Sequence, residues 1–155
     1  MGRAGQVGQV GEITEATSVA SPTRPTSPTR LVAAVSLIYD ALVGVVMIAG
    51  RPILAQLFQV QLPQPPIHAD LNGVFLLAVA LGYTIPYRDP DSRAGRGYLW
   101  VMGPFLKGLG AVTFVLDHVV RHSPRSFLLF AASDGALALL TLWVLLSVPS
   151  RSAAA

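Results

Sequence analysis

The segment Ser126–Val148 places the strongest constraint on how this chain can fold, because it is a near-continuous apolar run with one charge, Asp134. Its length suits a bilayer crossing, which takes about 20 apolar residues in a helix. A helix in a soluble bundle needs a polar face, whereas here Ser133, Asp134 and Thr141 are nearly alone among apolar neighbours. We therefore expect this segment to be a helix surrounded by lipid.

The composition extends this expectation to most of the chain. Of its 155 residues, 52% are hydrophobic and 12% are charged, whereas soluble domains carry about 25% charged residues. The sequence predicts an all-α, integral membrane four-helix bundle that forms one domain over residues 31–148. The four predicted spans are residues 31–50, 70–87, 98–120 and 126–148.

The two ends of the chain differ from this domain. Residues 1–30 are rich in Gly, Ser, Thr, Pro and Gln and have little apolar surface to offset the entropy of ordering. We expect a disordered cytoplasmic tail here, either a spacer or a docking or phosphorylation segment. Residues 149–155 form a short C-terminal tail.

The connections carry further signals. Residues 51–58, RPILAQLF, have apolar positions at helical spacing and predict a short helix in the membrane interface. The prolines that follow at 63, 65 and 66 predict a non-helical segment. Residues 88–97 read as a polar loop.

Prolines and tyrosines mark the middle spans. The second span is expected to end at Pro86, with Tyr83 and Tyr87 at the headgroup level. Pro104 is expected to kink the third span.

The positive charges predict the orientation. Short loops rich in Lys and Arg stay in the cytoplasm. With the N-terminus inside, seven arginines lie inside and three outside, and Lys107 lies in the bilayer. We therefore expect a multi-pass protein of the inner (plasma) membrane with both termini cytoplasmic. The inner set is Arg3, Arg24, Arg30, Arg88, Arg93, Arg96 and Arg151, and the outer set is Arg51, Arg121 and Arg125.

Three ionisable residues fall inside predicted spans: Asp40, Lys107 and Asp134. Such groups are rare in the bilayer and usually face the bundle interior in pairs. One lysine satisfies one aspartate, so the second needs a proton, a water or another donor. This intramembrane polar network is either a fixed interhelical ion pair, a ligand or substrate site, or part of an ion pathway.

A second group of polar residues is expected at the outer interface. His68, Asp70 and Asn72 begin the second span, and Asp117 and His118 end the third. His and carboxylate side chains are metal ligands in many proteins, but these spacings match no specific metal motif. We assign no metal to them.

Several function classes lack their sequence signatures. The chain has no cysteine, which excludes disulfides, thiolate metal sites and cysteine nucleophiles. It has no phosphate-binding glycine loop, nucleophile elbow or zinc-protease helix, and no basic run with interleaved aromatics for nucleic acid. We therefore assign no catalytic residue, no cofactor and no nucleic-acid partner, and expect no enzyme activity.

The layout resembles a known group. Four short spans, LIYDALVGVVMIAGRPILAQLF over residues 37–58, and third and fourth spans rich in small residues resemble the DoxX-like small bacterial membrane proteins. The resemblance implies an inner-membrane protein, sometimes associated with redox or quinone complexes. The arginine that this group often carries early in its first span corresponds here only to Arg30. Small four-helix multidrug exporters also carry an acid in the first span, but Lys107 opposes a cation-binding pocket.

These features predict a non-catalytic accessory or scaffold subunit, or one that binds a lipophilic small molecule between its helices. Its partners would be the bilayer and a membrane protein or a second copy of the chain. The alternatives are a proton-coupled transporter that uses Asp40 and Asp134, or a redox or quinone-associated subunit.

Overall fold

The computed structural model describes residues 27–62 and 64–148. Every regular element in these two segments is a helix. Four helical stretches, Pro28–Ala49, Ile67–Arg88, Arg93–Arg121 and Arg125–Ser147, are long and apolar enough to cross a membrane. The predicted all-α class is thus confirmed for these segments, and so is the prediction of four helices long and apolar enough to cross a membrane. The predicted disordered tail lies almost wholly outside the described residues, as do residues 149–155.

The first helix, α1 (Pro28–Ala49), begins earlier than expected. The side chain of Ser27 accepts a hydrogen bond from the backbone N–H of Arg30 at 3.3 Å, and Pro28 occupies the first turn. A serine N-cap followed by proline is a favoured way to start a helix. Residues 28–30, which were assigned to the tail, therefore belong to the helix.

A short helix follows, as the sequence predicted. α2 (Arg51–Phe58) starts directly after Gly50 and ends at Gln59, which has a left-handed backbone conformation. Residues 60–62 and 64–66 are not helical, as the prolines of this segment predicted, and they lead to α3 (Ile67–Gly82).

The second span continues through Pro86, which corrects the predicted end. After α3, the chain forms α4 (Thr84–Arg88), and Pro86 lies within this last turn and is buried. Proline is tolerated in the first turn of a helix, where its missing N–H has no intrahelical acceptor. Tyr83, which was expected at the headgroup level, is instead fully buried, in a cluster that includes Ala33 of α1 and Leu99.

The third span is one long helical stretch of three parts. α5 (Arg93–Trp100) leads into a π-helical segment, η1 (Val101–Lys107), and then into α6 (Gly108–Arg121). The predicted polar loop is therefore shorter than residues 88–97. Helix formation begins at Arg93 because Ser92 caps it, accepting a hydrogen bond from the N–H of Gly95 at 3.0 Å.

The last span follows a tight turn. His122 has a left-handed backbone conformation, and a short 3₁₀ helix, η2 (Arg125–Phe127), leads into α7 (Leu128–Ser147). This agrees with the predicted span within a few residues.

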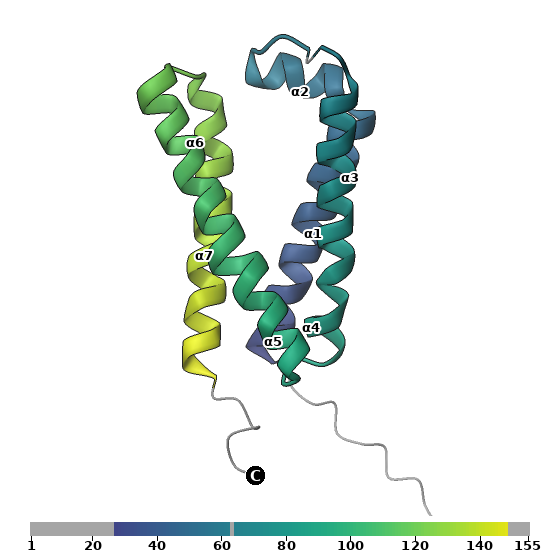
Figure 1. Cartoon of the computed structure of the whole chain (residues 1–155), viewed down its shortest axis with the longest axis vertical. Coiled ribbons are helices and arrows are strands. Elements are labelled where there is room, and N and C mark those ends of the chain that lie inside the picture. The colour runs from purple at the N-terminus through teal and green to yellow at the C-terminus, as the bar shows by residue number, and fades with distance from the viewer. Residues whose placement is uncertain (1–26, 63, 149–155) are drawn as a thin grey trace, which may run out of the picture.

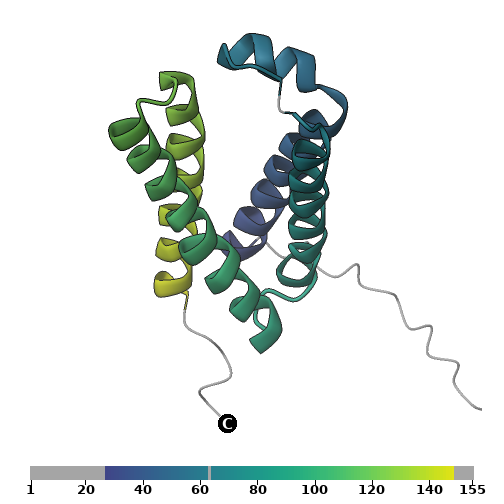
Figure 2. The same cartoon turned by 45° about the horizontal axis from the view of Figure 1, so that its top comes forward.

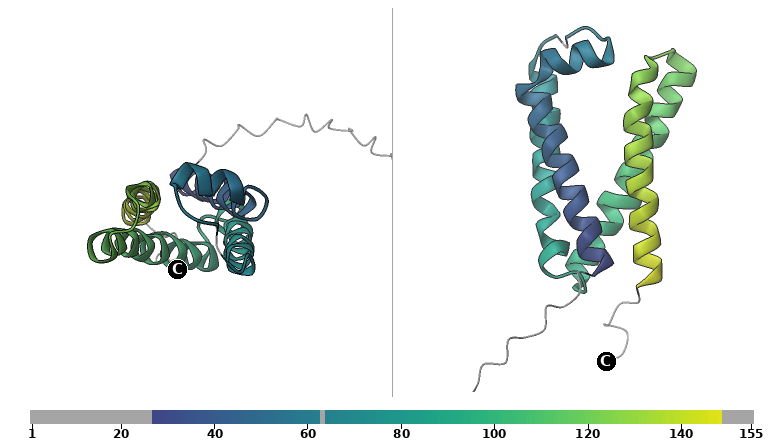
Figure 3. Two further views of the ribbon diagram at one scale, coloured as in Figure 1. Left: turned by 90° about the horizontal axis from the view of Figure 1, so that it is seen from above. Right: turned by 180° about the vertical axis from the view of Figure 1, so that it is seen from behind.

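The helices form two antiparallel pairs that diverge (Figure 1). α1 packs along α3, and α6 packs along α7. The long α5–η1–α6 stretch crosses from one pair to the other, so the pairs meet near α4 and α5 and separate toward α2. Figure 2 and Figure 3 show the same separation from other directions. The start of α1 and the end of α7 lie at the same end of the molecule.

Small residues allow α1 and α3 to approach closely. A Cβ added to Gly73 would lie 2.5 Å from a side-chain carbon of Ile48 and 2.8 Å from the carbonyl oxygen of Gly44. A Cβ on Gly44 would likewise lie 2.9 Å from the carbonyl oxygen of Gly73. Close backbone approach of this kind drives helix association where water is excluded.

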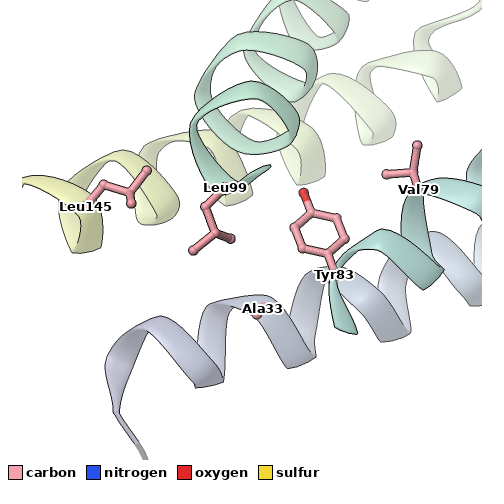
Figure 4. Packing of buried hydrophobic residues seen from close by; sticks show 5 residues of the cluster. All are labelled: Ala33, Val79, Tyr83, Leu99 and Leu145. Atoms are coloured by element: carbon pink, nitrogen blue, oxygen red, sulfur yellow. The ribbon is translucent and has the colours of Figure 1, made fainter. Parts of the chain in front are cut away.

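A small apolar core holds the two pairs together where they meet. It combines Ala33 of α1, Val79 of α3, Tyr83, Leu99 of α5 and Leu145 of α7 (Figure 4). Tyr98 packs edge-on against Tyr83, with ring centroids 5.2 Å apart, and donates a hydrogen bond to the Val79 carbonyl at 2.6 Å.

An arginine fastens the end of α7 to α5. The guanidinium of Arg96 donates hydrogen bonds to the carbonyls of Leu145 at 2.8 Å and Val148 at 2.9 Å. The last carbonyls of a helix lack intrahelical donors, so a cation here both satisfies them and complements the helix dipole.

Candidate functional site

Lys107 owes its position to the irregular backbone before it. Pro104 lacks an N–H and its ring would collide with the carbonyl four residues earlier in a regular α-helix. The chain adopts a π-helix over Val101–Lys107 instead, and such segments are frequent at functional sites. The sequence indicated a kink at Pro104. The helix widens there, and Lys107 ends the widened segment with its side chain turned into the protein.

Asp40 receives that side chain. Nζ of Lys107 lies 2.5 Å from Oδ1 of Asp40. Asp40 belongs to the predicted stripe of Ser36, Asp40 and Gly44 on α1, and all three are buried. The expected interhelical pairing of Asp40 with Lys107 is therefore present.

Asp134 of α7 completes the network at a longer distance. Its Oδ1 lies 3.6 Å from Nζ of Lys107, within reach of ionic attraction but beyond a hydrogen bond. The exposed fractions of the three side chains are 1% for Asp40, 6% for Lys107 and 18% for Asp134. The structure therefore brings the predicted trio together, and Asp134 is its most accessible member.

Tyr39 is a fourth member that the sequence analysis did not identify. Its ring centroid lies 4.7 Å from Nζ of Lys107, a distance at which a cation is attracted to the aromatic face. Its hydroxyl lies 2.7 Å from Oγ of Ser133. The signal was in the sequence, since Tyr39 and Ser133 each directly precede one of the two acids.

The network forms one polar end of a cavity between the helix pairs. This main cavity has a volume of about 410 Å³, within the usual range for small-molecule sites of about 300–1,000 Å³. Apart from the network and Asn72, its side chains are apolar. The lining residues are Tyr39, Asp40, Val43, Met47, Asn72, Phe75, Leu76, Val79, Leu106, Lys107, Gly110, Phe114, Phe127, Phe130 and Asp134.

An outer chamber of about 340 Å³ adjoins the main cavity below α2. The two spaces share the lining residues Met47, Asn72, Phe127 and Phe130. Phe58 of α2 stacks on Phe130, with centroids 5.0 Å apart, and on Phe127, at 5.9 Å. Ser126 donates a hydrogen bond to the Phe58 carbonyl at 2.9 Å. α2 thus connects the two helix pairs at their separated ends and covers the outer chamber.

The residues of the expected outer-interface group do not form one cluster. His68, Asp70 and Asn72 lie on α3, whereas Asp117 and His118 lie on α6, which is separate from α3 at this end (Figure 1). On each of these two helices, the aspartate forms an ion pair with a nearby arginine.

Asp70 pairs with Arg51 at 3.1 Å, and Asp117 pairs with Arg121 at 3.1 Å. Nδ1 of His118 lies 2.7 Å from the carbonyl oxygen of Ser123. Within residues 27–62 and 64–148, no three His, Asp or Glu side chains are grouped to hold a metal ion. His68 and Asn72 instead line the outer chamber.

No family model, curated protein or solved structure matches the chain.

Proposed function

We propose that the chain is a multi-pass membrane protein that binds a small lipophilic molecule between its two helix pairs and has no catalytic activity of its own. The observation that carries this proposal is the main cavity, which has apolar walls and a polar network at one end. Most specific small-molecule sites combine apolar walls with a few placed polar groups in this way.

The outward surface supports placement in a membrane. Large apolar side chains on all four long helical stretches point away from the protein, and such a continuous apolar surface is unusual on a soluble monomer. Examples with more than half of the side chain exposed are Ile38, Leu42, Leu71, Leu81, Phe105, Val112, Val119, Leu129, Leu139 and Leu146.

The arginines support an orientation with both termini of the chain on the cytoplasmic side. Arg30, Arg88, Arg93 and Arg96 lie at the end where α1 starts and α7 ends. At the α2 end, Arg51 and Arg121 are each paired with an aspartate.

Cysteine labelling tests this orientation directly, because the chain has no cysteine of its own. Gln61→Cys, beyond α2, should react with an impermeant maleimide on intact cells. Asp91→Cys, between α4 and α5, should react only after the membrane is permeabilised. The reverse pattern would contradict the orientation, and reaction of both on intact cells would contradict the proposed crossings.

Ligand binding is tested by filling the cavity. Leu76→Trp places a larger side chain in the main cavity, whereas Leu139→Trp points outward from α7, where Leu139 is 69% exposed. In native mass spectra of mild membrane extracts, the wild type and Leu139→Trp should carry the same lipophilic molecule, and Leu76→Trp should lack it. A wild type without such a molecule, or equal retention in Leu76→Trp, would contradict the proposal.

A second function is favoured by Asp134. This carboxylate lines the cavity next to a lysine that is already paired with Asp40, so it is placed to exchange a proton with a transported solute. Proton-coupled transport would require the two acids. Equal solute-driven proton flux in proteoliposomes of the wild type and of an Asp40→Asn/Asp134→Asn double variant would eliminate it.

A further inference from the structure

The polar end of the main cavity has more hydrogen-bond acceptors than donors. Nζ of Lys107 supplies one hydrogen bond to Oδ1 of Asp40, and another face of the ammonium is turned to the Tyr39 ring. Among the described residues, Oδ2 of Asp40 and Oδ1 of Asp134 are buried without a hydrogen-bond donor. Buried carboxylate oxygens without donors are costly, so a ligand that supplies N–H groups would be favoured here.

Among the residues that line the cavity, Tyr39 provides the one hydroxyl, and it is engaged with Ser133 at 2.7 Å. Ser133 has one proton, and its Oγ also lies 2.9 Å from the Leu129 carbonyl and 3.2 Å from the Phe130 carbonyl of its own helix. In the hydrogen bond between Tyr39 and Ser133, either oxygen can be the donor. Asn72 is the remaining polar lining residue, and it lies at the boundary with the outer chamber.

The balance of charge also favours a ligand that supplies N–H groups, in particular a cationic one. Two carboxylates face one ammonium, and Lys107 is committed to Asp40, the more deeply buried of the two. Lys107 also lies 3.6 Å from Oδ1 of Asp134 and repels a second cation, as expected from the sequence, but the two carboxylates together leave one negative charge without a cation of its own. Phe75, Phe114, Phe127 and Phe130 also line the cavity, and aromatic faces attract cations.

We propose, as a refinement of the lipophilic-ligand function above, that the ligand is a lipophilic amine. Its ammonium group pairs with Asp134 and donates to the unsatisfied carboxylate oxygens, and its apolar body lies along the phenylalanines toward the outer chamber. A ligand that ends in a carbonyl or a carboxylate would add acceptors to an end of the cavity that already has too many.

The test compares three spin-labelled amphiphiles that share one alkyl chain and end in a primary amine, an alcohol or a carboxylate. Each is titrated into nanodiscs of zwitterionic lipid containing the full chain, and the saturable immobilised component is measured by electron paramagnetic resonance. One added ion pair should make the amine bind about tenfold more tightly than the alcohol. This comparison uses the wild type and needs no variant.

Two isosteric variants then locate the site. Asp134→Asn should reduce amine binding to the level of the alcohol. Asp117→Asn, which removes a carboxylate on α6 outside the cavity, should leave the preference for the amine unchanged. If the Asp134→Asn variant binds the alcohol as tightly as the wild type does, its cavity is intact.

Different failures overturn different proposals. If the alcohol or the carboxylate binds the wild type as tightly as the amine, or if Asp134→Asn keeps the preference, the ligand is not an amine held by Asp134. The lipophilic-ligand function would survive that result. If none of the three amphiphiles gives a saturable component, both proposals fail.

Discussion

Lys107 and Asp40 form a buried ion pair although 67 positions separate them in the chain. The pair joins the α5–η1–α6 stretch to α1 and so links the two helix pairs near the level where they begin to separate. It therefore has a structural role that can be measured independently of any ligand.

Replacing Lys107 by Met should destabilise the protein strongly. The change leaves the Asp40 carboxylate buried and unpaired, and breaking a buried pair in this way costs about 3–5 kcal/mol. Adding Asp40→Asn should restore part of the loss, because the more deeply buried of the two carboxylates is then neutral. Denaturant unfolding of the purified protein in mild detergent measures both effects, and a Lys107→Met variant as stable as the wild type would show that the pair does not hold the helices together.

Adding one methyl group at Gly73 should loosen the contact between α1 and α3. The new Cβ of Gly73→Ala would overlap Ile48 and the Gly44 carbonyl, and overpacking of this kind costs about 1–3 kcal/mol. Gly97→Ala is the matched control, since a Cβ there meets nothing within 4 Å. Thermal unfolding should separate the two variants, and identical midpoints would argue against close packing at Gly73.

Removing the guanidinium of Arg96 should free the end of α7. Arg96→Gln loses two charge-assisted hydrogen bonds to the Leu145 and Val148 carbonyls, each worth about 1.5–3 kcal/mol. Hydrogen–deuterium exchange should become faster in the last turn of α7 and stay unchanged in α3. Arg93→Gln is the control, because it removes an exposed arginine from the first turn of α5, the helix that also carries Arg96. This variant should leave hydrogen–deuterium exchange in α7 unchanged.

Truncating Phe58 should detach α2 from the α6–α7 pair. Phe58 is 7% exposed and stacks on Phe127 and Phe130, and each aromatic pair adds about 0.5–1.5 kcal/mol beyond burial. The two pairs together add about 1–3 kcal/mol, so amide exchange in α2 should rise by roughly fivefold or more. Leu57→Ala, at a position with 66% of the side chain exposed, should change it little, and equal rates in the two variants would mean that the stack does not hold α2.

The sequence predicted the spans because long apolar helices leave a strong local signal. It also predicted that Asp40, Lys107 and Asp134 would meet, since charges in apolar spans have few other partners. The starts of α1 and α5 were misplaced because their signals are the single serine caps Ser27 and Ser92, which are weak beside hydropathy.

Tertiary contacts explain the remaining differences. Tyr83 was expected at the lipid headgroups, and only its packing with Leu99 and Tyr98 shows why it is buried. The predicted outer-interface group does not form, because α3 and α6 diverge at the α2 end of the molecule (Figure 1). Asp70 and Asp117 are each paired with a nearby arginine instead. The divergence itself, and therefore the cavity, has no local sequence signal.

The first residue of α1 and the last residue of α7 lie at the same end of the bundle (Figure 1). In the proposed membrane orientation, two copies could therefore be joined head to tail by a flexible linker that stays on one side of the bilayer. Such a fused duplicate would keep its eight proposed crossings in their original directions, so a cavity in one half could be altered while the other half stays intact.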